Sequence, residues 1–377
     1  MSRPRLLAVC TTVTWPIREG FTLRVDGLIR ELVRDWDVTF VGLCQSCEQA
    51  ALPPEIRFIA IPRTSTAFEP DAGERAVLIN TAKKMKEEIS PDAMLLWMGP
   101  DLEFVRVLGG KRMVVDLVDC STVYSWLALR GSRGLRGWLR QLRELLWYIR
   151  AERQVGREAS SVVAVGELDA SVLRKLIGRN NVYVVPNGVC VTESALTSGR
   201  DPSPVVVFTG VMGYPPNVEA VLWFSRKVWP LIRRAVPEAR FLIAGRNPVP
   251  EIECLVETPG IEVLGSVPDM AEILRRAWVS VAPMRSGTGI KNKVLEAWAV
   301  GTPVVMTPLA ANGLGEADAI RAMVGADPEA FADLVVSLLK DSDCREKVGM
   351  EALELARERS WSTVAANLSS LLTQVST

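Results

Sequence analysis

The stretch from Pro283 to Val305 reads P-M-R-S-G-T-G-I-K-N-K-V-L-E-A-W-A-V-G-T-P-V-V. It follows an apolar, β-branched run from Val279 to Ala282, so the pattern predicts a strand, a glycine loop, a helix and a further strand. The free N–H groups and the dipole at the start of a helix attract anions. The predicted unit is therefore suited to bind a phosphate group.

The charged residues inside this stretch indicate which phosphate compound it would hold. Lys291 and Lys293 place positive charge beside the expected anion, and Glu296 can accept two hydrogen bonds from a vicinal diol such as ribose. We therefore interpret the stretch as a nucleoside-diphosphate site. The alternative is a βαβ crossover whose glycines only form a tight turn. Asn292 stands where a dinucleotide fingerprint has its third glycine, which disfavours a nicotinamide site.

The composition is that of a globular chain with room for two domains. Of the 377 residues, 48% are apolar and 23% are charged. The 44 basic and 44 acidic residues cancel, so no global charge favours binding to nucleic acid or membrane. No apolar run reaches transmembrane length, and we expect no signal peptide. We expect a cytoplasmic protein, with the inner face of the membrane as an alternative location.

The chain contains no histidine. This excludes Ser-His-Asp and Cys-His catalysis, histidine metal sites and an imidazole general base. Any chemistry must therefore use carboxylates, lysine, arginine, hydroxyl groups, backbone dipoles or the substrate itself.

Short apolar runs alternate with amphipathic segments of helix length, which predicts βαβ units and parallel sheets. We expect helices that include 22–34, 74–89, 217–234, 270–276 and 291–300. The strands are expected at 6–11, 38–43, 56–60, 93–97, 113–117, 161–165, 182–185, 205–209, 240–244, 261–265, 279–282 and 304–306. Near residues 185–189 the pattern is interrupted, and a polar segment rich in Ser, Thr and Pro follows up to Pro204. We therefore expect two α/β halves, whose glycine loops at 14–20 and 210–216 face a shared cleft.

The segment from Arg130 to Glu158 is rich in arginine and tryptophan and has helical periodicity. The favoured interpretation is an ordinary amphipathic helix that packs on the first sheet and leaves its arginines in solvent. The alternative is a basic amphipathic face that makes peripheral contact with a membrane or a lipid phosphate.

Several segments together resemble family-4 glycosyltransferases of the GT-B fold, in the bacterial sugar-transferase group. The motifs that carry the resemblance are Val184-Val-Pro-Asn-Gly-Val189, Phe208-Thr-Gly-Val-Met-Gly-Tyr-Pro-Pro-Asn217, Phe241-Leu-Ile-Ala-Gly-Arg-Asn-Pro248, Gly265-Ser-Val-Pro-Asp269, the stretch quoted first, Ser360-Trp361, Gly20-Phe-Thr-Leu-Arg24 and Val115-Asp-Leu-Val-Asp119. The resemblance implies two Rossmann-like, parallel-sheet domains that face a central cleft. An acceptor-binding domain would span residues 1–185 and a donor-binding domain 186–361, and a helix at about 362–377 would pack back on the first domain.

The resemblance also implies roles for individual residues. Glu296 would hold the ribose hydroxyls of a nucleotide-sugar donor, UDP- or GDP-linked, with no further cofactor. Backbone groups at 288–290 would meet the diphosphate, and the loop at 265–268 would lie against the base. The residues expected to bind the donor are Gly20, Arg24, Gly210, Val267, Gly287, Thr288, Gly289, Ile290, Lys293 and Glu296.

Catalysis would retain the anomeric configuration and is expected to depend on Asp119, Asp116 and Lys291. The lysine would stabilise the leaving diphosphate, and the carboxylates would orient the acceptor, which is a glycan, a lipid-linked sugar or a small molecule. We expect no metal, because Asp35-Trp-Asp37 and Asp341-Ser-Asp343, which match the D-x-D pattern, fall at surface turns.

Two positions depart from the family pattern. Thr288 stands where many members have a glutamate that contacts the donor sugar, and the segment 211–216 lacks an arginine and a lysine that grip the diphosphate. The departures leave an alternative function open: a non-catalytic GT-B protein that binds a nucleotide sugar or supports a partner enzyme.

Overall fold

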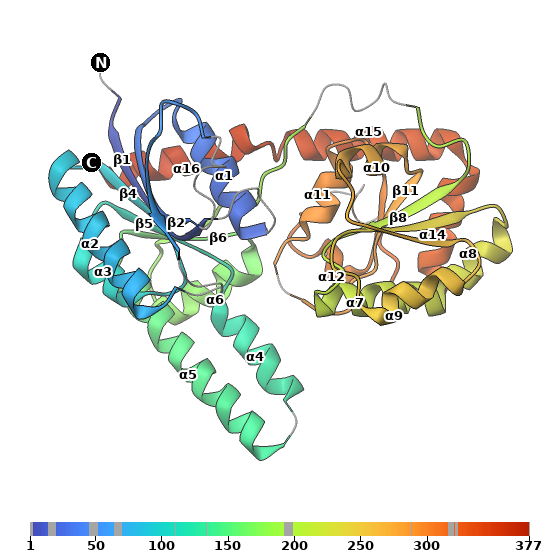
Figure 1. Cartoon of the computed structure of the whole chain (residues 1–377), viewed down its shortest axis with the longest axis horizontal. Helices are drawn as coiled ribbons and strands as arrows, with labels where there is room; N and C mark the ends of the chain where they lie inside the picture. The colour runs from blue at the N-terminus through green and yellow to red at the C-terminus, as the bar shows by residue number, and fades with distance from the viewer. Residues whose placement is uncertain are drawn as a thin grey trace. The chain divides into compact units, whose positions relative to one another are not determined.

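The computed structural model describes residues 3–13, 20–44, 52–63, 70–109, 111–132, 134–191, 199–287, 289–315, 320 and 323–376. The chain divides into two compact units (Figure 1). Unit 1 comprises Met1–Gly188 and Trp361–Thr377, and unit 2 comprises Val189–Ser360. Within the described residues each unit is built around one parallel sheet, so the expected two-sheet α/β fold is confirmed. The division after Gly188 lies three residues beyond the boundary expected from the sequence.

Unit 1 contains a seven-stranded parallel sheet in the order β3-β2-β1-β4-β5-β6-β7. The strands are β1 Arg5–Val13, β2 Asp37–Cys44, β3 Arg57–Pro62, β4 Ala93–Trp97, β5 Met113–Val118, β6 Ser161–Ala164 and β7 Val182–Val184. The helices are α1 Gly20–Leu32, α2 Ala72–Ile89, α3 Leu102–Leu108, α4 Ser121–Gly131, α5 Leu135–Glu158, α6 Glu167–Ile177 and α16 Trp361–Ser376. The central strands are buried on both faces, which explains their continuous apolar runs.

The last helix, α16, completes the core on one face of this sheet. Its apolar residues pack with those of α1 and of strands β1, β2 and β4. The ring of Trp361 fills the space above Gly27 and Gly188, where a Cβ atom would lie 2.4 Å and 2.5 Å from ring atoms. Ser369 accepts a hydrogen bond from Nε1 of Trp36 (3.0 Å). The final helix therefore belongs to the first unit.

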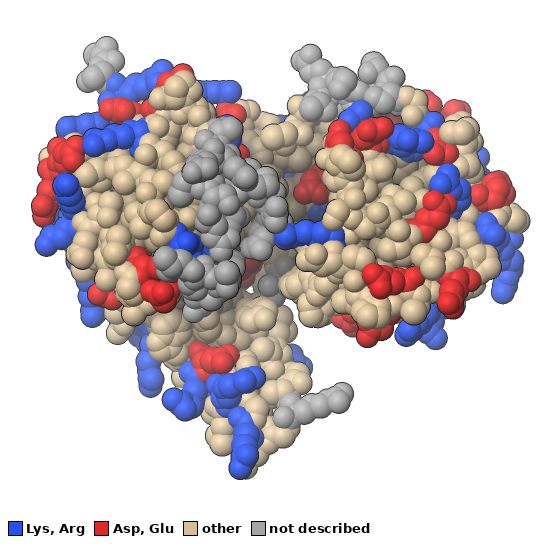
Figure 2. All heavy atoms as spheres, viewed as in Figure 1, with Lys and Arg blue, Asp and Glu red and all other residues tan. Residues whose placement is uncertain are grey.

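Helices α4 and α5 form a hairpin that extends away from the sheet (Figure 1). None of the first ten residues of α5, Leu135 to Glu144, is buried, and burial begins only at Leu145. The favoured interpretation therefore holds for the second half of α5, which packs into the core of unit 1, and not for the first ten residues. Figure 2 shows mostly uncharged surface on the near face of the hairpin, with basic side chains toward its tip. Among the described residues, no helix combines the length and apolar composition needed to span a bilayer.

Unit 2 contains a five-stranded parallel sheet in the order β10-β9-β8-β11-β12. The strands are β8 Val205–Thr209, β9 Arg240–Ala244, β10 Ile261–Gly265, β11 Val279–Ala282 and β12 Val304–Met306. The helices are α7 Pro215–Trp223, a π-helical segment Phe224–Val228, α8 Trp229–Ala235, α9 Pro250–Glu253, a 3-10 turn Cys254–Glu257, α10 Met270–Arg276, α11 Asn292–Trp298, α12 Pro308–Ala311, α14 Pro328–Lys340 and α15 Ser342–Arg357.

The helix expected at 217–234 is interrupted by the π-helical segment. Pro230 has no N–H group and cannot bond to the carbonyl four residues earlier. The turn before it widens, and the N–H of Trp229 donates to the carbonyl of Phe224, five residues back. The proline thus explains why one apolar pattern yields three helical segments.

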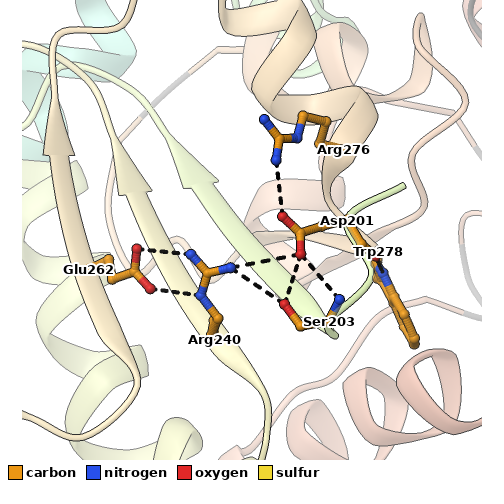
Figure 3. A network of polar contacts seen from close by, with 6 residues as sticks. All are labelled: Asp201, Ser203, Arg240, Glu262, Arg276 and Trp278. Atoms are coloured by element: carbon orange, nitrogen blue, oxygen red, sulfur yellow. Dashed lines mark hydrogen bonds and ion pairs between the residues drawn. The ribbon is translucent and has the colours of Figure 1, made fainter. Parts of the chain in front are cut away.

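A polar network fixes the start of unit 2 at the amino ends of its strands (Figure 3). Asp201 accepts hydrogen bonds from the backbone N–H (3.1 Å) and Oγ (2.8 Å) of Ser203, and it pairs with Arg276 (3.2 Å). Arg240 forms two hydrogen bonds to the carboxylate of Glu262, at 2.7 and 3.0 Å. These contacts join the segment before β8 to β9, β10 and α10. They lie at the opposite edge of the sheet from the loops that follow β8 and β11.

Candidate nucleotide-sugar site

The sheet of unit 2 has a topological switch point between β8 and β11. From β8 the chain continues outward to β9 and β10, whereas from β11 it continues to β12 on the other side. The loops that follow β8 and β11 therefore diverge, and in open α/β sheets ligands bind beyond the carboxyl ends of the strands at such a point. The loop after β8 begins at Gly210, and the loop after β11 is the glycine-rich segment 283–291. Both loops predicted to bind the donor therefore lie at this switch point.

Close backbone packing holds the loops at this edge. The N–H of Gly210 donates to the carbonyl of Ala244 (3.1 Å), and the N–H of Gly245 donates to that of Gly265 (2.7 Å). Gly210 and Gly245 have φ angles of +153° and +151°, which residues with a side chain rarely adopt. The glycines therefore allow the loops after β8, β9 and β10 to lie in direct backbone contact.

Lys293 reaches from α11 to the loop after β8. Its Nζ donates to Oδ1 of Asn217 on α7 (2.8 Å) and lies 3.8 Å from the centroid of the Phe208 ring. A Cβ atom on Gly210 would lie 3.1 Å from the same Nζ. The ammonium group thus lies beside the Gly210 loop, which lacks the arginine and lysine of the family pattern. Lys293 supplies a positive charge at that place from another element.

Burial perturbs both ionisable groups of α11 in this site. Removal from water is the main cause that lowers the pKa of Lys293. The charge of Glu296 opposes this change and the charge of Lys291 adds to it, and the resulting pKa is about 7. Burial also raises the pKa of Glu296, an effect that Lys293 partly offsets. Among the described residues, no donor is hydrogen-bonded to the Glu296 carboxylate. Two interacting groups with perturbed pKa values are typical of a binding or catalytic site.

The glycine loop after β11 is held against α7 by two side-chain contacts. Oγ of Ser286 donates to Oε2 of Glu219 (2.5 Å), and the Arg285 guanidinium lies 5.2 Å from the centre of the Trp223 ring. Gly287 and Gly289 have φ angles of +100° and +69°, so both positions favour glycine. Thr288, predicted to meet the diphosphate, lies outside the described residues.

The remaining residues predicted for unit 2 lie around this loop. Lys291 is buried and its Nζ donates to the carbonyl of Gly289 (3.0 Å). Ile290 is buried, and Val267 is half-buried in the loop after β10. The helix α11 begins at Asn292 and has seven residues, fewer than the ten expected. The two lysines add full positive charges to the partial charge at the start of this helix.

One protein-family model matches the part of the chain that contains this site. The model of the family described as "Glycosyl transferases group 1" matches residues 203–341, which include all these loops. The matched residues all lie within unit 2 and make up less than half of the chain.

Curated relatives match the chain only in part. The phosphatidyl-myo-inositol mannosyltransferase of Mycobacterium leprae is 29% identical over 246 residues, 60% of this chain and 61% of the relative. The protein of the same name from Mycolicibacterium smegmatis is 30% identical over 227 residues, 58% of this chain and 56% of the relative. The chain thus aligns with somewhat more than half of each relative's length.

Solved structures resemble both units of the chain. WaaG, a glycosyltransferase involved in lipopolysaccharide biosynthesis, has a TM-score of 0.65 at 14% identity and covers 97% of this chain and 99% of its own. HepE from Anabaena, in complex with UDP, has a TM-score of 0.66 at 13% identity and covers 98% of this chain and 100% of its own. These similarities show that the fold is GT-B.

In unit 1, two of the predicted residues, Arg24 and Asp116, lie differently from expectation. Arg24 and Asp116 are fully buried, and Nε of Arg24 donates to Oδ2 of Asp116 (2.8 Å). The same carboxylate accepts hydrogen bonds from Nε1 of Trp97 (3.0 Å) and from the N–H of Val118 (3.0 Å). The resemblance implies a place beside the acceptor for Asp116 and beside the donor for Arg24. Here both serve as a buried pair that joins α1 to β5, because each satisfies the charge of the other.

The other two predicted residues of unit 1 remain accessible. Gly20 is exposed and is the first residue of α1, while the segment before it, 14–19, lies outside the described residues. Asp119 is half-buried and follows β5 directly, at the carboxyl edge of the sheet. That edge corresponds to the ligand side of an open α/β sheet.

The sequence did not assign a role to Asn217, Phe208 or Glu219. Asn217 and Phe208 stand at the ends of a quoted motif, but their contact with Lys293 joins positions 76 and 85 residues apart. Nothing in the local pattern specifies such a contact. The glycine at 210 is the one signal that a bulky group approaches from elsewhere.

Proposed function

We propose that the chain transfers a sugar from a nucleoside-diphosphate sugar to an acceptor hydroxyl and retains the anomeric configuration. The observation that carries this proposal is the placement of Lys293 between the two diverging loops of unit 2, in the part of the chain that matches the group 1 glycosyltransferase model. Lys293 is half-buried with a lowered pKa, and it is an expected anion partner because the charge of a bound diphosphate would raise that pKa again.

The donor would bind along the loops that follow β8 and β11 in unit 2. Lys293 and Lys291 would neutralise the diphosphate, and Glu296 would accept hydrogen bonds from the ribose hydroxyls. UDP is present in the solved structure of HepE, and a further structure of that protein contains UDP-glucose, which supports a nucleotide-sugar donor here. The base would lie against the loop that contains Val267.

The chemistry would be a front-face displacement at the anomeric carbon. The bond from that carbon to the β-phosphate oxygen breaks, and a bond to the acceptor oxygen forms on the same face. The acceptor proton passes to the leaving diphosphate, so no histidine is required. Lys293 and Lys291 would stabilise the negative charge that develops on the diphosphate, which lowers the barrier more than it stabilises the bound donor.

The acceptor would be bound by unit 1. Asp119 is the candidate to orient its hydroxyl group, since it lies at the carboxyl edge of the first sheet and keeps partial access to solvent. The resemblance implies a glycan, a lipid-linked sugar or a small molecule. The curated relatives named phosphatidyl-myo-inositol mannosyltransferase support an acceptor that carries a polyol.

The test begins with calorimetric titration of the protein with UDP, GDP, dTDP and ADP. We expect one nucleotide to bind and Glu296→Gln to weaken it at least tenfold, because one ribose contact loses its charge. Glu238→Gln replaces an exposed glutamate of the same unit and should leave the affinity unchanged. The matching sugar nucleotide should then be hydrolysed slowly in the absence of an acceptor.

Two results would change the proposal. If no nucleotide binds, the donor site is refuted. If a nucleotide sugar binds with Glu296-dependent affinity but neither hydrolysis nor transfer occurs with any acceptor class, the chain is a non-catalytic binding protein of the GT-B fold.

A further inference from the structure

The α4–α5 hairpin of unit 1 concentrates exposed apolar side chains. Of the sixteen large apolar side chains exposed among the described residues, eight lie on these two helices. Those eight are Tyr124, Trp126, Leu127, Leu135, Trp138, Leu139, Leu146 and Trp147. Exposed apolar side chains that are scattered singly need no explanation, but a contiguous set marks an interaction surface.

The same hairpin is strongly basic. Residues 121–158 contain eight arginines, no lysine and three glutamates. Two of the glutamates are already engaged: Glu152 is buried and accepts hydrogen bonds at the start of α4, and Glu158 pairs with Arg106 (3.1 Å). Among the described residues, none of Arg136, Arg140 and Arg143 forms an ion pair, and all three are exposed. The solvent-facing charge of the hairpin is therefore positive, although the whole chain is neutral.

The apolar and basic residues form adjacent stripes on α5. Leu135, Leu139 and Leu146 are spaced by four and seven residues, so they share one face of the helix. Arg136 follows Leu135, and Arg143 lies three residues before Leu146. Both arginines therefore lie on the neighbouring face of the helix. Long arginine side chains can then extend beside a buried leucine and keep their charged ends in a polar layer.

The first ten residues of α5 project beyond the core of unit 1. At 1.5 Å per residue they extend the helix by about 15 Å. None of them is buried, so their exposed side chains contribute little to the core of the unit. These residues can therefore insert into a lipid layer or contact a partner without a change in the fold of unit 1.

We propose that the α4–α5 hairpin docks unit 1 on an anionic lipid bilayer. Its tryptophans and leucines would enter the interfacial layer, and its arginines would bind lipid phosphates. A second copy of the chain is a poorer partner for this face, because a symmetric contact would place one arginine stripe opposite the other.

The experiment is co-sedimentation of the full chain with phosphatidylcholine vesicles that contain either no or 30% phosphatidylglycerol. We expect binding to the anionic vesicles, with at least tenfold weaker binding to neutral ones. Arg136→Gln/Arg140→Gln/Arg143→Gln should weaken binding at least tenfold and reduce its dependence on salt. Leu135→Gln/Leu139→Gln/Leu146→Gln should weaken it to a similar extent at every salt concentration.

Matched controls separate the hairpin from general surface effects. Arg226→Gln/Lys227→Gln/Arg234→Gln removes three exposed cations from unit 2. Val77→Gln/Val256→Gln/Met350→Gln removes three exposed apolar side chains elsewhere. Both controls should bind as the wild type does, and the thermal midpoints of all variants should confirm that they are folded.

The proposal is overturned if anionic vesicles do not bind the chain, or if the hairpin and control variants bind equally. It is also overturned if sedimentation velocity shows a dimer that the hairpin variants convert to monomer while vesicle binding is absent. Since vesicle binding is measured without a nucleotide, its outcome is independent of the proposed transferase activity.

Discussion

A Cβ atom on Gly245 would lie 1.6 Å from the carbonyl oxygen of Gly210. The obstacle is backbone, so it cannot rotate away as a side chain would. We predict that Gly245→Ala lowers the free energy of unfolding by roughly 3 kcal/mol and weakens nucleotide binding, because the loops after β8 and β9 must separate. Urea denaturation and calorimetry measure the two effects.

Gly265→Ala is the matched control for this substitution. Gly265 also has a positive φ angle, +65°, but a Cβ atom there meets nothing within 4 Å. It should cost only about 1 kcal/mol, from backbone strain. Equal losses for the two variants would show that the close approach at Gly245 does not exist in solution.

Lys293 makes the stability of the chain depend on pH. Its pKa of about 7 in the folded protein lies below its ordinary value of 10.5, so the unfolded chain binds more protons between these values. Stability therefore rises with pH through this window. We predict that Lys293→Met stabilises the free protein by about 2 kcal/mol at pH 7 and that the gain shrinks toward pH 10. Urea denaturation of the wild type and of the variant at each pH gives two free energies of unfolding, and their difference is the contribution of Lys293.

The same variant should lose nucleotide affinity, because the charge that destabilises the free site would stabilise the bound diphosphate. A Lys293→Met protein that is no more stable than the wild type at pH 7 would contradict the buried position of the ammonium group.

The buried pair of Arg24 and Asp116 should be among the most sensitive parts of unit 1. Asp116→Asn leaves the Arg24 guanidinium without a charged partner, and we predict a loss of about 3–5 kcal/mol. Glu88→Gln, which breaks an exposed pair with Arg57, should cost less than about 1 kcal/mol. If Asp116→Asn instead folds normally but abolishes turnover, the carboxylate has a catalytic role after all. Urea denaturation and a transfer assay distinguish the two results.

The network around Asp201 predicts a different dependence on pH. The hydrogen bond from Ser203 lowers the pKa of Asp201 below its ordinary value of 3.8, with smaller contributions from Arg240 and Arg276. Its contribution to stability is present above pH 3.8 and is lost as the pH falls through the lowered pKa. Asp201→Asn should therefore cost about 1 kcal/mol at pH 7 and progressively less below pH 4. Asp333 is exposed, so the stability difference between Asp333→Asn and the wild type should not change with pH in this way.

The strands could be predicted well because local chemistry specifies them. A strand of a parallel sheet that is covered on both faces consists of a short run of apolar, β-branched residues, and the runs at 93–97, 240–244 and 279–282 coincide with observed strands. The division near Gly188 was visible for a similar reason, since a polar linker follows it.

Contacts between distant residues could not be predicted in the same way. Arg24 and Asp116 are 92 positions apart, and neither residue reveals in sequence that it is fully buried. The periodicity of α5 identified an amphipathic helix but not what its apolar side faces. Burial and pairing depend on how elements are arranged, whereas strand propensity depends on neighbours in the chain.

The position of α16 has a consequence for how this protein is made. Trp361 fills the space above Gly27 and Gly188, yet it is synthesised only after the whole of Val189–Ser360 has been added. On the ribosome, unit 1 therefore lacks the helix that covers α1 and β4 until unit 2 has been synthesised, and unit 2 can fold in the meantime. Of the two units, the one whose synthesis begins earlier is therefore completed later. Until then its apolar surface is exposed and is available to chaperones.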